Sequence, residues 1–363
     1  MSNLEKIVKW LGTTSYEGVV LGRRDNFKWI TEENANAVVT NGEVGIAFLV
    51  IEKSGKVKMI ADSSDCRRMS AEQNALGAEC ILAPWYETLD GFLADCCRGK
   101  KYASDTGISD TVYVQGELVD LRMQLSQKEL ERYREIGQEC ARIVESVAKD
   151  ARPGQTENEV AAMLKCRCIE KGVSPDCVLV GSDDRILKYR HPVPTDKKIE
   201  KSLMVVLGGE KYGLNISMTR IVSYGKPDKE IAARMKKTQY IFASMQNMME
   251  DGMAYNEYFR KVQKLYDEAG WPGEWKMHHQ GGPTGYGCRE FVVTPDTKGT
   301  LREGQAYAWN PTILGTKCEE TTYLKDGRDG RVEILTRTKD WPCTVVETEY
   351  GSLDVADILE LPV

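Results

Sequence analysis

The chain has 363 residues and a formal net charge of −6, and its 49 basic and 55 acidic side chains form no long block of either sign. This balance argues against nucleic acid or a membrane surface as a partner, and it favours a small-molecule or short peptide substrate. The length exceeds that of one ordinary domain, so we expect two domains that each bury a core.

The first third of the chain alternates short apolar runs with turns. The predicted elements are strands at 18–21, 45–51, 57–60 and 80–82 and a helix at 65–76. The second and third strands flank a Gly-containing turn, a pattern that predicts a hairpin. Residues 1–120 are therefore predicted to form an α/β domain.

A second domain, residues 125–363, is predicted to begin with a long helix, and the boundary falls within 115–124. Ser126 followed by Glu129 forms a capping box ahead of apolar residues at helical spacing. The further predicted elements are helices at 154–172, 231–249 and 255–269 and strands at 203–207, 216–222 and 306–309. The predicted fold class is thus α/β (α+β) throughout.

The N-terminus is polar, and no segment approaches the ~18 apolar residues of a membrane span, so we expect a soluble cytoplasmic protein. Eleven scattered cysteines are typical of reduced cytosolic thiols. Cys166 and Cys168 lack the two-residue spacer and the second cluster of a zinc site, so we expect them to be structural thiols.

The three histidines fall in only two places, which predicts that both belong to one site. His191 lies in the segment Arg190-His191-Pro192, and His278 and His279 are adjacent. The alternative is structural: His191 opens a turn before the proline, and His278 donates to a backbone carbonyl.

Four further polar segments lie in apolar or glycine-rich surroundings. As a strand, 215–220 would present Ser217 and its alternate neighbours on one face. The glycines of 281–290 suit close approach to a ligand, whereas this segment lacks the Lys-Ser/Thr ending of a phosphate loop. The remaining polar candidates are Tyr286, Arg289 and Glu290 in that loop, Asn310 before Pro311, and the pair Glu319-Glu320.

These segments, in this order, resemble the creatinase / aminopeptidase P / methionine aminopeptidase family over nearly the whole chain. Residues 26–31 and Trp85 look like its smaller N-terminal domain, and everything from about Ser126 looks like its pita-bread domain. The segment ending Thr219-Arg220 looks like the family's Asp-Ile-Thr-Arg strand. The resemblance therefore implies a creatinase-type domain followed by a pita-bread domain, and it suggests a homodimer.

In that family two aspartates, a histidine and two glutamates hold two divalent metal ions. The resemblance places the corresponding positions at Val206, Ser217, Pro283, Asn310 and Glu319, or at Glu320 for the last. One carboxylate without an imidazole cannot replace such a site. We therefore expect no metal and no other cofactor.

Creatinase works on this fold without metal, through a histidine that transfers protons. His191 lies within one residue of that histidine, and His279 matches the first histidine of the aminopeptidase P His-x-x-x-His segment. We therefore predict a metal-independent hydrolase that cleaves a C–N bond in a small amidino, amide or amino-acid-like substrate by acid–base catalysis.

The predicted roles are catalytic for three side chains and substrate-binding for nine. The catalytic residues are His191, His279 and Glu319; the substrate-binding residues are Arg190, Ser217, Arg220, His278, Tyr286, Arg289, Glu290, Asn310 and Glu320. Arg220 and Arg289 would bind a substrate carboxylate, or else form ion pairs at the edge of the sheet. One alternative function is a non-catalytic domain that binds a peptide or protein, and another is an Xaa-Pro-type metallopeptidase with a degenerate site.

Overall fold

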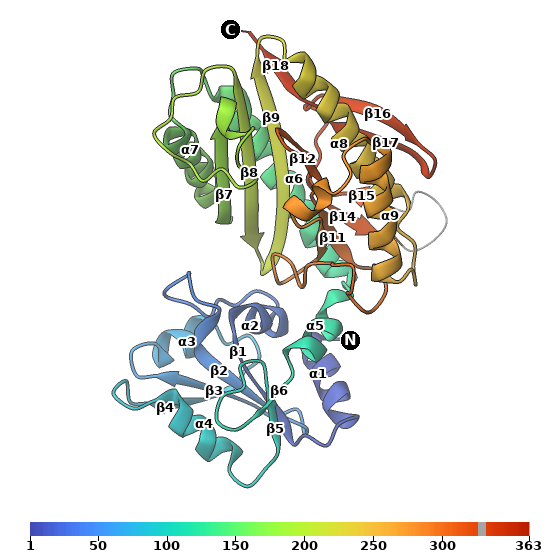
Figure 1. Cartoon of the computed structure of the whole chain (residues 1–363). Coiled ribbons are helices and arrows are strands. Elements are labelled where there is room, and N and C mark those ends of the chain that lie inside the picture. The colour runs from blue at the N-terminus through green and yellow to red at the C-terminus, as the bar shows by residue number, and fades with distance from the viewer. Residues whose placement is uncertain (326–331, 363) are drawn as a thin grey trace. The chain divides into compact units, whose positions relative to one another are not determined.

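The computed structural model describes residues 1–325 and 332–362. The chain divides into two compact units, Met1–Gln124 and Leu125–Val363, which are described separately (Figure 1). In the part of the chain that the structure describes, no helix combines the length and the apolar character needed to cross a membrane.

The N-terminal unit is built on one six-stranded mixed sheet in the order β4-β3-β2-β1-β5-β6. The strands are β1 (Gly18–Arg23), β2 (Val44–Glu52), β3 (Val57–Asp62), β4 (Glu79–Ala83), β5 (Tyr102–Ser104) and β6 (Val112–Tyr113). The helices are α1 (Asn3–Gly12), α2 (Arg24–Thr31), α3 (Cys66–Glu72), α4 (Leu89–Cys97) and α5 (Gln115–Met123). β2 and β3 pair antiparallel across the glycine-containing turn, as the sequence pattern predicts.

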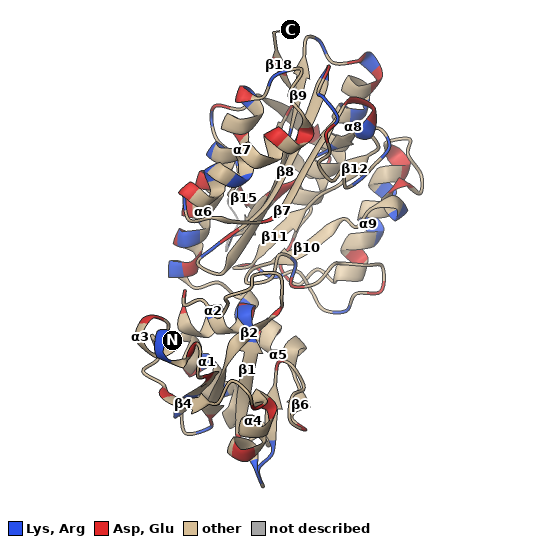
Figure 2. Cartoon of the chain, turned by 90° about the vertical axis from the view of Figure 1, so that its left-hand side faces the viewer, with Lys and Arg blue, Asp and Glu red and all other residues tan. Residues whose placement is uncertain are grey.

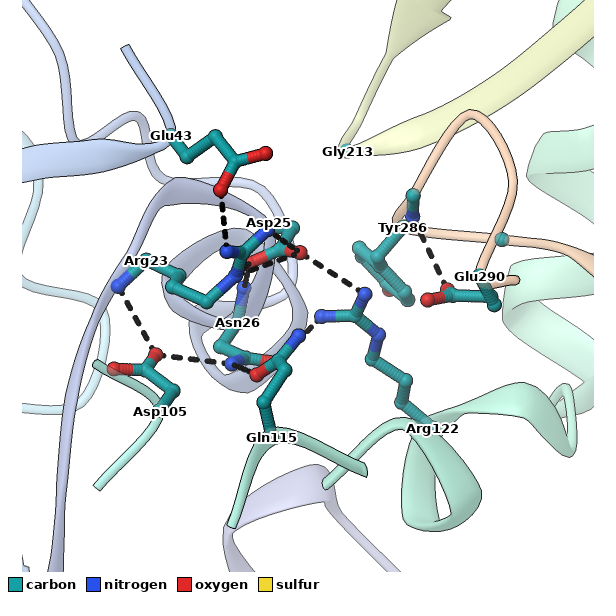
Figure 3. Close-up of polar contacts among 12 residues, drawn as sticks. Arg23, Asp25, Asn26, Glu43, Asp105, Gln115, Arg122, Gly213, Tyr286 and Glu290 are labelled. Atoms are coloured by element: carbon teal, nitrogen blue, oxygen red, sulfur yellow. Dashed lines mark hydrogen bonds and ion pairs between the residues drawn. The ribbon is translucent and has the colours of Figure 1, made fainter. Parts of the chain in front are cut away.

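A buried polar network joins α2 and α5 within this unit (Figure 3). The Arg122 guanidinium, only 1% exposed, lies 3.0 Å from an Asp25 carboxylate oxygen. Asn26 donates to Asp105 at 2.9 Å, and Asp105 also accepts the backbone N–H of Arg23 at 3.0 Å. Because each buried polar group has a partner, the network stabilises the start of α2.

Within residues 125–325 and 332–362, the C-terminal unit contains two four-stranded sheets and two hairpins. One sheet has the order β18-β9-β8-β7 and the other β10-β11-β14-β15. The strands are β7 (Ser174–Ser182), β8 (Ser202–Lys211), β9 (Leu214–Tyr224), β10 (Gly281–Thr284), β11 (Ala306–Trp309), β12 (Thr312–Ile313), β13 (Thr316–Lys317), β14 (Glu320–Leu324), β15 (Val332–Ile334), β16 (Cys343–Thr348), β17 (Gly351–Ala356) and β18 (Leu359–Leu361).

Four long helices pack around these sheets. They are α6 (Gln127–Asp150), α7 (Glu157–Glu170), α8 (Lys229–Asn247) and α9 (Tyr255–Glu268). α6 lies on β8 and β9, α7 lies on β7, and α8 packs against the β16–β17 hairpin (Figure 1). The predicted capping box starts α6: Ser126 accepts from the Glu129 N–H at 3.3 Å, and Glu129 accepts from the Ser126 N–H at 2.7 Å.

The two sheets meet where β9 runs beside the start of β14. The Thr219 N–H donates to the Glu319 carbonyl at 3.1 Å, and the Ser217 N–H donates to the Thr321 hydroxyl at 2.8 Å. β8 and β9 are buried along almost their whole length, although polar and apolar residues alternate over 215–219 of β9. On the helices around the sheets, acidic and basic residues are interspersed along the chain (Figure 2).

Candidate active site

The three histidines meet at one place, and we call His191, His278 and His279 the histidine cluster. One ring nitrogen from each lies within 4.8 Å of the others. The Nε2 atoms of His191 and His278 are 2.9 Å apart, so one donates a hydrogen bond and the other accepts it. The rings of His278 and His279 stack with centroids 4.4 Å apart. Two segments 87 residues apart therefore supply one group of imidazoles.

His278 is buried, whereas His191 and His279 are exposed. Burial, followed by the positive charge of Lys317, lowers the pKa of His278 to about 2. Desolvation and then the charges of Arg289 and Lys317 lower the pKa of His279, and desolvation followed by Lys317 lowers that of His191. At neutral pH each ring is therefore uncharged, with one N–H and one lone pair.

A second group of polar side chains surrounds the buried carboxylate of Glu319, and we call it the Glu319 cluster. Lys317 Nζ lies 3.1 Å from one carboxylate oxygen, which also accepts from the Thr219 hydroxyl at 2.7 Å. The other oxygen accepts from Arg289 Nη2 at 3.2 Å and from the Asn310 amide at 3.4 Å. Each carboxylate oxygen thus has one cationic and one neutral donor.

These contacts keep Glu319 ionised although it is buried. Burial acts to raise its pKa, but the charges of Lys317 and Arg289 and the hydrogen bond from Thr219 outweigh burial and lower the pKa to about 2. Arg289 also donates to the Ser217 hydroxyl at 2.8 Å. The cluster therefore joins β9, the loop after β10, and the start of β14 into one polar unit.

The donors at the five family metal positions do not fit two divalent ions. Four of the positions carry no charge, and they are Val206, Ser217, Pro283 and Asn310. The fifth, Glu319, already has both oxygens engaged by an ammonium and a guanidinium. Divalent ions of this type require several anionic or imidazole ligands. Here two side-chain cations provide the positive charge that balances the carboxylate.

Arg220 and Glu320, for which substrate binding is predicted, are both buried and form an ion pair with each other. Arg220 is 1% exposed, and its five N–H donors contact Glu145, Glu320 and the carbonyls of Thr219 and Thr336. The ion-pair alternative describes this residue. Glu320 points to Arg220 and accepts a hydrogen bond from the Thr336 hydroxyl at 2.6 Å. Of the two adjacent glutamates, Glu319 is therefore the one that corresponds to the last metal-binding glutamate of the family.

Three other predicted ligand-binding side chains hold loops in place. Tyr286 is buried and donates to Glu129 at 2.9 Å. Glu290 accepts the Gly287 N–H at 3.1 Å and so closes the glycine-rich loop (Figure 3). Arg190 donates to the Thr312 hydroxyl at 2.8 Å and pairs with Glu274. Their contacts position the site from outside the two clusters.

Sequence reasoning missed Lys317 as a functional residue. It lies two residues before Glu319 in extended chain, and this spacing places alternate side chains on one side. Its side chain is only 3% exposed, which is unusual for lysine and is explained by the pairing with Glu319. The available sign was a lysine and a glutamate at i and i+2, Lys317 and Glu319, on either side of Cys318.

A cavity lies apart from both clusters. A cavity of about 310 Å³ lies beside the start of α8 and the end of β9, and Ile231, Tyr224 and Ile358 are among its lining residues. None of the twelve predicted site residues lines it. We locate the candidate site by its convergent titratable groups, because a catalytic site needs them and a mostly apolar cavity does not.

The free thiols agree with the sequence prediction. All eleven cysteines lie in the described part of the chain, and none forms a disulfide there. Burial raises the pKa of Cys168 to about 12, and burial also raises the pKa of Cys318 well above its usual value. Such thiols behave as structural residues.

Comparison with solved structures gives the fold. The prolidase from Pyrococcus horikoshii OT3 has a TM-score of 0.77 at 18% identity, with 93% of this chain and 98% of that chain covered. The Xaa-Pro dipeptidase from Bacillus anthracis has 0.75 at 17%, with 99% of each chain covered. The N-terminal domain of FACT complex subunit SPT16 from Cicer arietinum has 0.67 at 10%, with coverages of 92% and 94%.

At these identities the likeness shows the fold alone, and it confirms the predicted pita-bread architecture. No curated protein sequence matches the chain. The sequence model of metallopeptidase family M24 matches residues 131–334, which is more than half of the chain. The resemblance found in the motifs is thereby confirmed: the chain belongs to metallopeptidase family M24.

Proposed function

We propose that the protein is a hydrolase that cleaves a C–N bond of a small amidino, amide or amino-acid-like substrate without the paired metal ions of its family. One observation carries the proposal: Lys317 and Arg289 already neutralise Glu319, the single carboxylate left at the five metal positions. The positive charge that a metal pair would supply comes from the chain itself.

The histidine cluster provides the proton transfer that hydrolysis requires. His191 takes a proton from a water molecule as its oxygen bonds to the substrate carbon, and the proton returns to the nitrogen as the C–N bond breaks. The hydrogen bond between His191 and His278 orients the His191 ring. His279, whose pKa responds to the charges of Arg289 and Lys317, donates to the developing oxyanion.

The charge of the site favours a substrate with an anionic group. Lys317 and Arg289 contribute two positive charges and Glu319 one negative charge, while the three imidazoles are neutral. The net positive charge suits a substrate carboxylate. Prolidase and Xaa-Pro dipeptidase, the names of two structural relatives, place dipeptides among the substrates to be tested.

The test is a screen of small amides, amidino compounds and Xaa-Pro dipeptides with the full chain in the presence of a chelator. Turnover should fall about 10²- to 10⁴-fold in His191→Ala and in His279→Ala. Lys188→Ala is the matched control, because Lys188 lies on the same loop, is exposed, and pairs with Asp184. Turnover that requires an added divalent metal, or that survives both histidine changes, contradicts the proposal.

A non-catalytic domain that binds a peptide or protein is the second candidate. The fold likeness to a domain of the FACT complex subunit favours it, since that protein is part of an assembly. This function predicts no turnover of any compound in the screen, together with peptide binding that is unchanged in His191→Ala. An Xaa-Pro metallopeptidase with a degenerate site is the third, and the donor set of the Glu319 cluster argues against it.

A further inference from the structure

The histidine cluster has the composition of a transition-metal site. It brings together all three imidazoles of the chain, and none of them occupies one of the five metal positions of the family. His278 Nδ1 is buried and has no hydrogen-bond partner among the described residues. The other ring nitrogen of His278, Nε2, lies 2.9 Å from His191 Nε2, so these two rings already direct nitrogen atoms at each other.

We infer that the histidine cluster binds one first-row transition metal ion, such as Zn²⁺, through one nitrogen of each of His191, His278 and His279. Imidazole is a preferred ligand of zinc, copper and nickel. Three protein ligands leave a fourth position for water, an anion or a substrate atom. This inference goes beyond the proposed function, and it concerns a place other than the paired-metal positions.

The spacing of the nitrogens is compatible with one ion after small side-chain movements. Ligand nitrogens at 2.0–2.1 Å from a tetrahedral zinc ion lie about 3.3 Å apart. His191 and His278 are now 2.9 Å apart, with a proton between their Nε2 atoms, so a metal that replaces this proton separates them slightly. The third nitrogen lies within 4.8 Å of the others and must approach. The exposed rings of His191 and His279 have room to rotate.

The nearby charges decide which ions can bind. Lys317 and Arg289 act on the histidines with positive charge, and Glu319 only partly offsets them. Hard ions that depend on carboxylates, such as Mg²⁺ or Ca²⁺, have no suitable ligands in the histidine cluster. Ions with high affinity for nitrogen gain from three imidazoles despite the positive field. The site should therefore discriminate strongly between Zn²⁺ and Mg²⁺.

The experiment is a calorimetric titration of the metal-free full chain with Zn²⁺ and with Mg²⁺, followed by zinc-edge anomalous diffraction from zinc-soaked crystals. We expect one Zn²⁺ per chain, no binding of Mg²⁺, and an anomalous peak among the three rings. His191→Ala and His279→Ala should each weaken zinc binding at least about tenfold, because one of three metal–nitrogen bonds is lost.

Exposed thiols could also bind zinc, and a cysteine control separates the two sources. Cys166→Ser and Cys343→Ser remove two exposed thiols and should leave the zinc affinity unchanged. Circular dichroism of each histidine variant checks that it is folded. Three results overturn the inference: no stoichiometric zinc binding, binding that is unchanged in both histidine variants, or binding that the cysteine variants abolish. The binding readout needs no substrate, so its failure is distinct from a failure of the proposed function.

Discussion

The ion pair between Lys317 and Glu319 should be among the most valuable polar contacts of the C-terminal unit. Replacing Lys317 with methionine keeps the volume and removes the charge, so Glu319 stays buried with one cation fewer. Removing one partner of a buried pair costs about 3–5 kcal/mol. Lys317 is the largest of the groups that lower the pKa of Glu319 to about 2, and Arg289 and Thr219 contribute as well. The net pKa shift from all of them corresponds to about 3 kcal/mol at neutral pH. This stability is present above the unfolded pKa near ~4.3 and is lost as the pH falls toward 2.

The assay is chemical denaturation of the full chain at pH 7, followed by circular dichroism. Lys264→Met is the matched control: Lys264 and Glu268 also lie 3.1 Å apart, but their side chains are 70% and 39% exposed, against 3% and 4% for the buried pair. Lys264→Met, which removes the exposed pair, should lower the free energy of unfolding by only about 0–1 kcal/mol. The double variant Lys317→Met/Glu319→Gln should lose less free energy of unfolding than the two single variants lose in sum, by about 0.5–3 kcal/mol. A cost for Lys317→Met as small as that for Lys264→Met refutes this reasoning.

Three further outcomes are expected. Burial acts to raise the pKa of Asp25, but the charges and hydrogen bonds of Arg122 and Arg23 together outweigh it, so the folded pKa is lowered. Acid unfolding curves below pH ~4 should therefore be steeper for the native chain than for Asp25→Asn. Gly281→Ala should lower the melting temperature of the protein far more than Gly154→Ala does. Both glycines have positive φ, but only at Gly281 would an added Cβ lie 2.0 Å from a backbone atom, the Ala308 carbonyl oxygen. Added Zn²⁺ should slow any turnover, and a chelator should restore it. A zinc ion on the histidine cluster would occupy the nitrogen lone pairs that accept protons during the reaction. Steady-state rates measured with and without zinc test this.

The elements of the fold were predictable because their determinants are local. Apolar periodicity and the Ser126 capping box place α6, and the runs around the Gly-containing turn place the β2–β3 hairpin. The family was predictable because its motifs keep their order along the chain even where the ligands have changed. Short strands such as β12 and β13 were not predictable, since two residues carry no periodicity.

The candidate site was only partly predictable, for a physical reason. The rarity of histidine indicated that His191 and His278-His279 belong together, and the structure brings them together. The sequence does not say which charges pair across the fold. Arg220 lies on the polar segment of β9, and Arg289 lies in the loop after β10. Arg220 is nevertheless enclosed by Glu145 and Glu320, whereas Arg289 contacts Glu319. Long-range pairing decides their roles, and it is specified only by the assembled sheets.

The proposed function requires that Lys317 and Arg289 supply the positive charge that the paired metal ions supply elsewhere in the family. The direct test is anomalous diffraction from crystals of the full chain soaked with Mn²⁺. The account predicts no manganese peak within bonding distance of Glu319 or Asn310, and both side-chain cations in contact with the carboxylate. Two peaks coordinated by Glu319, with Lys317 displaced, would contradict it.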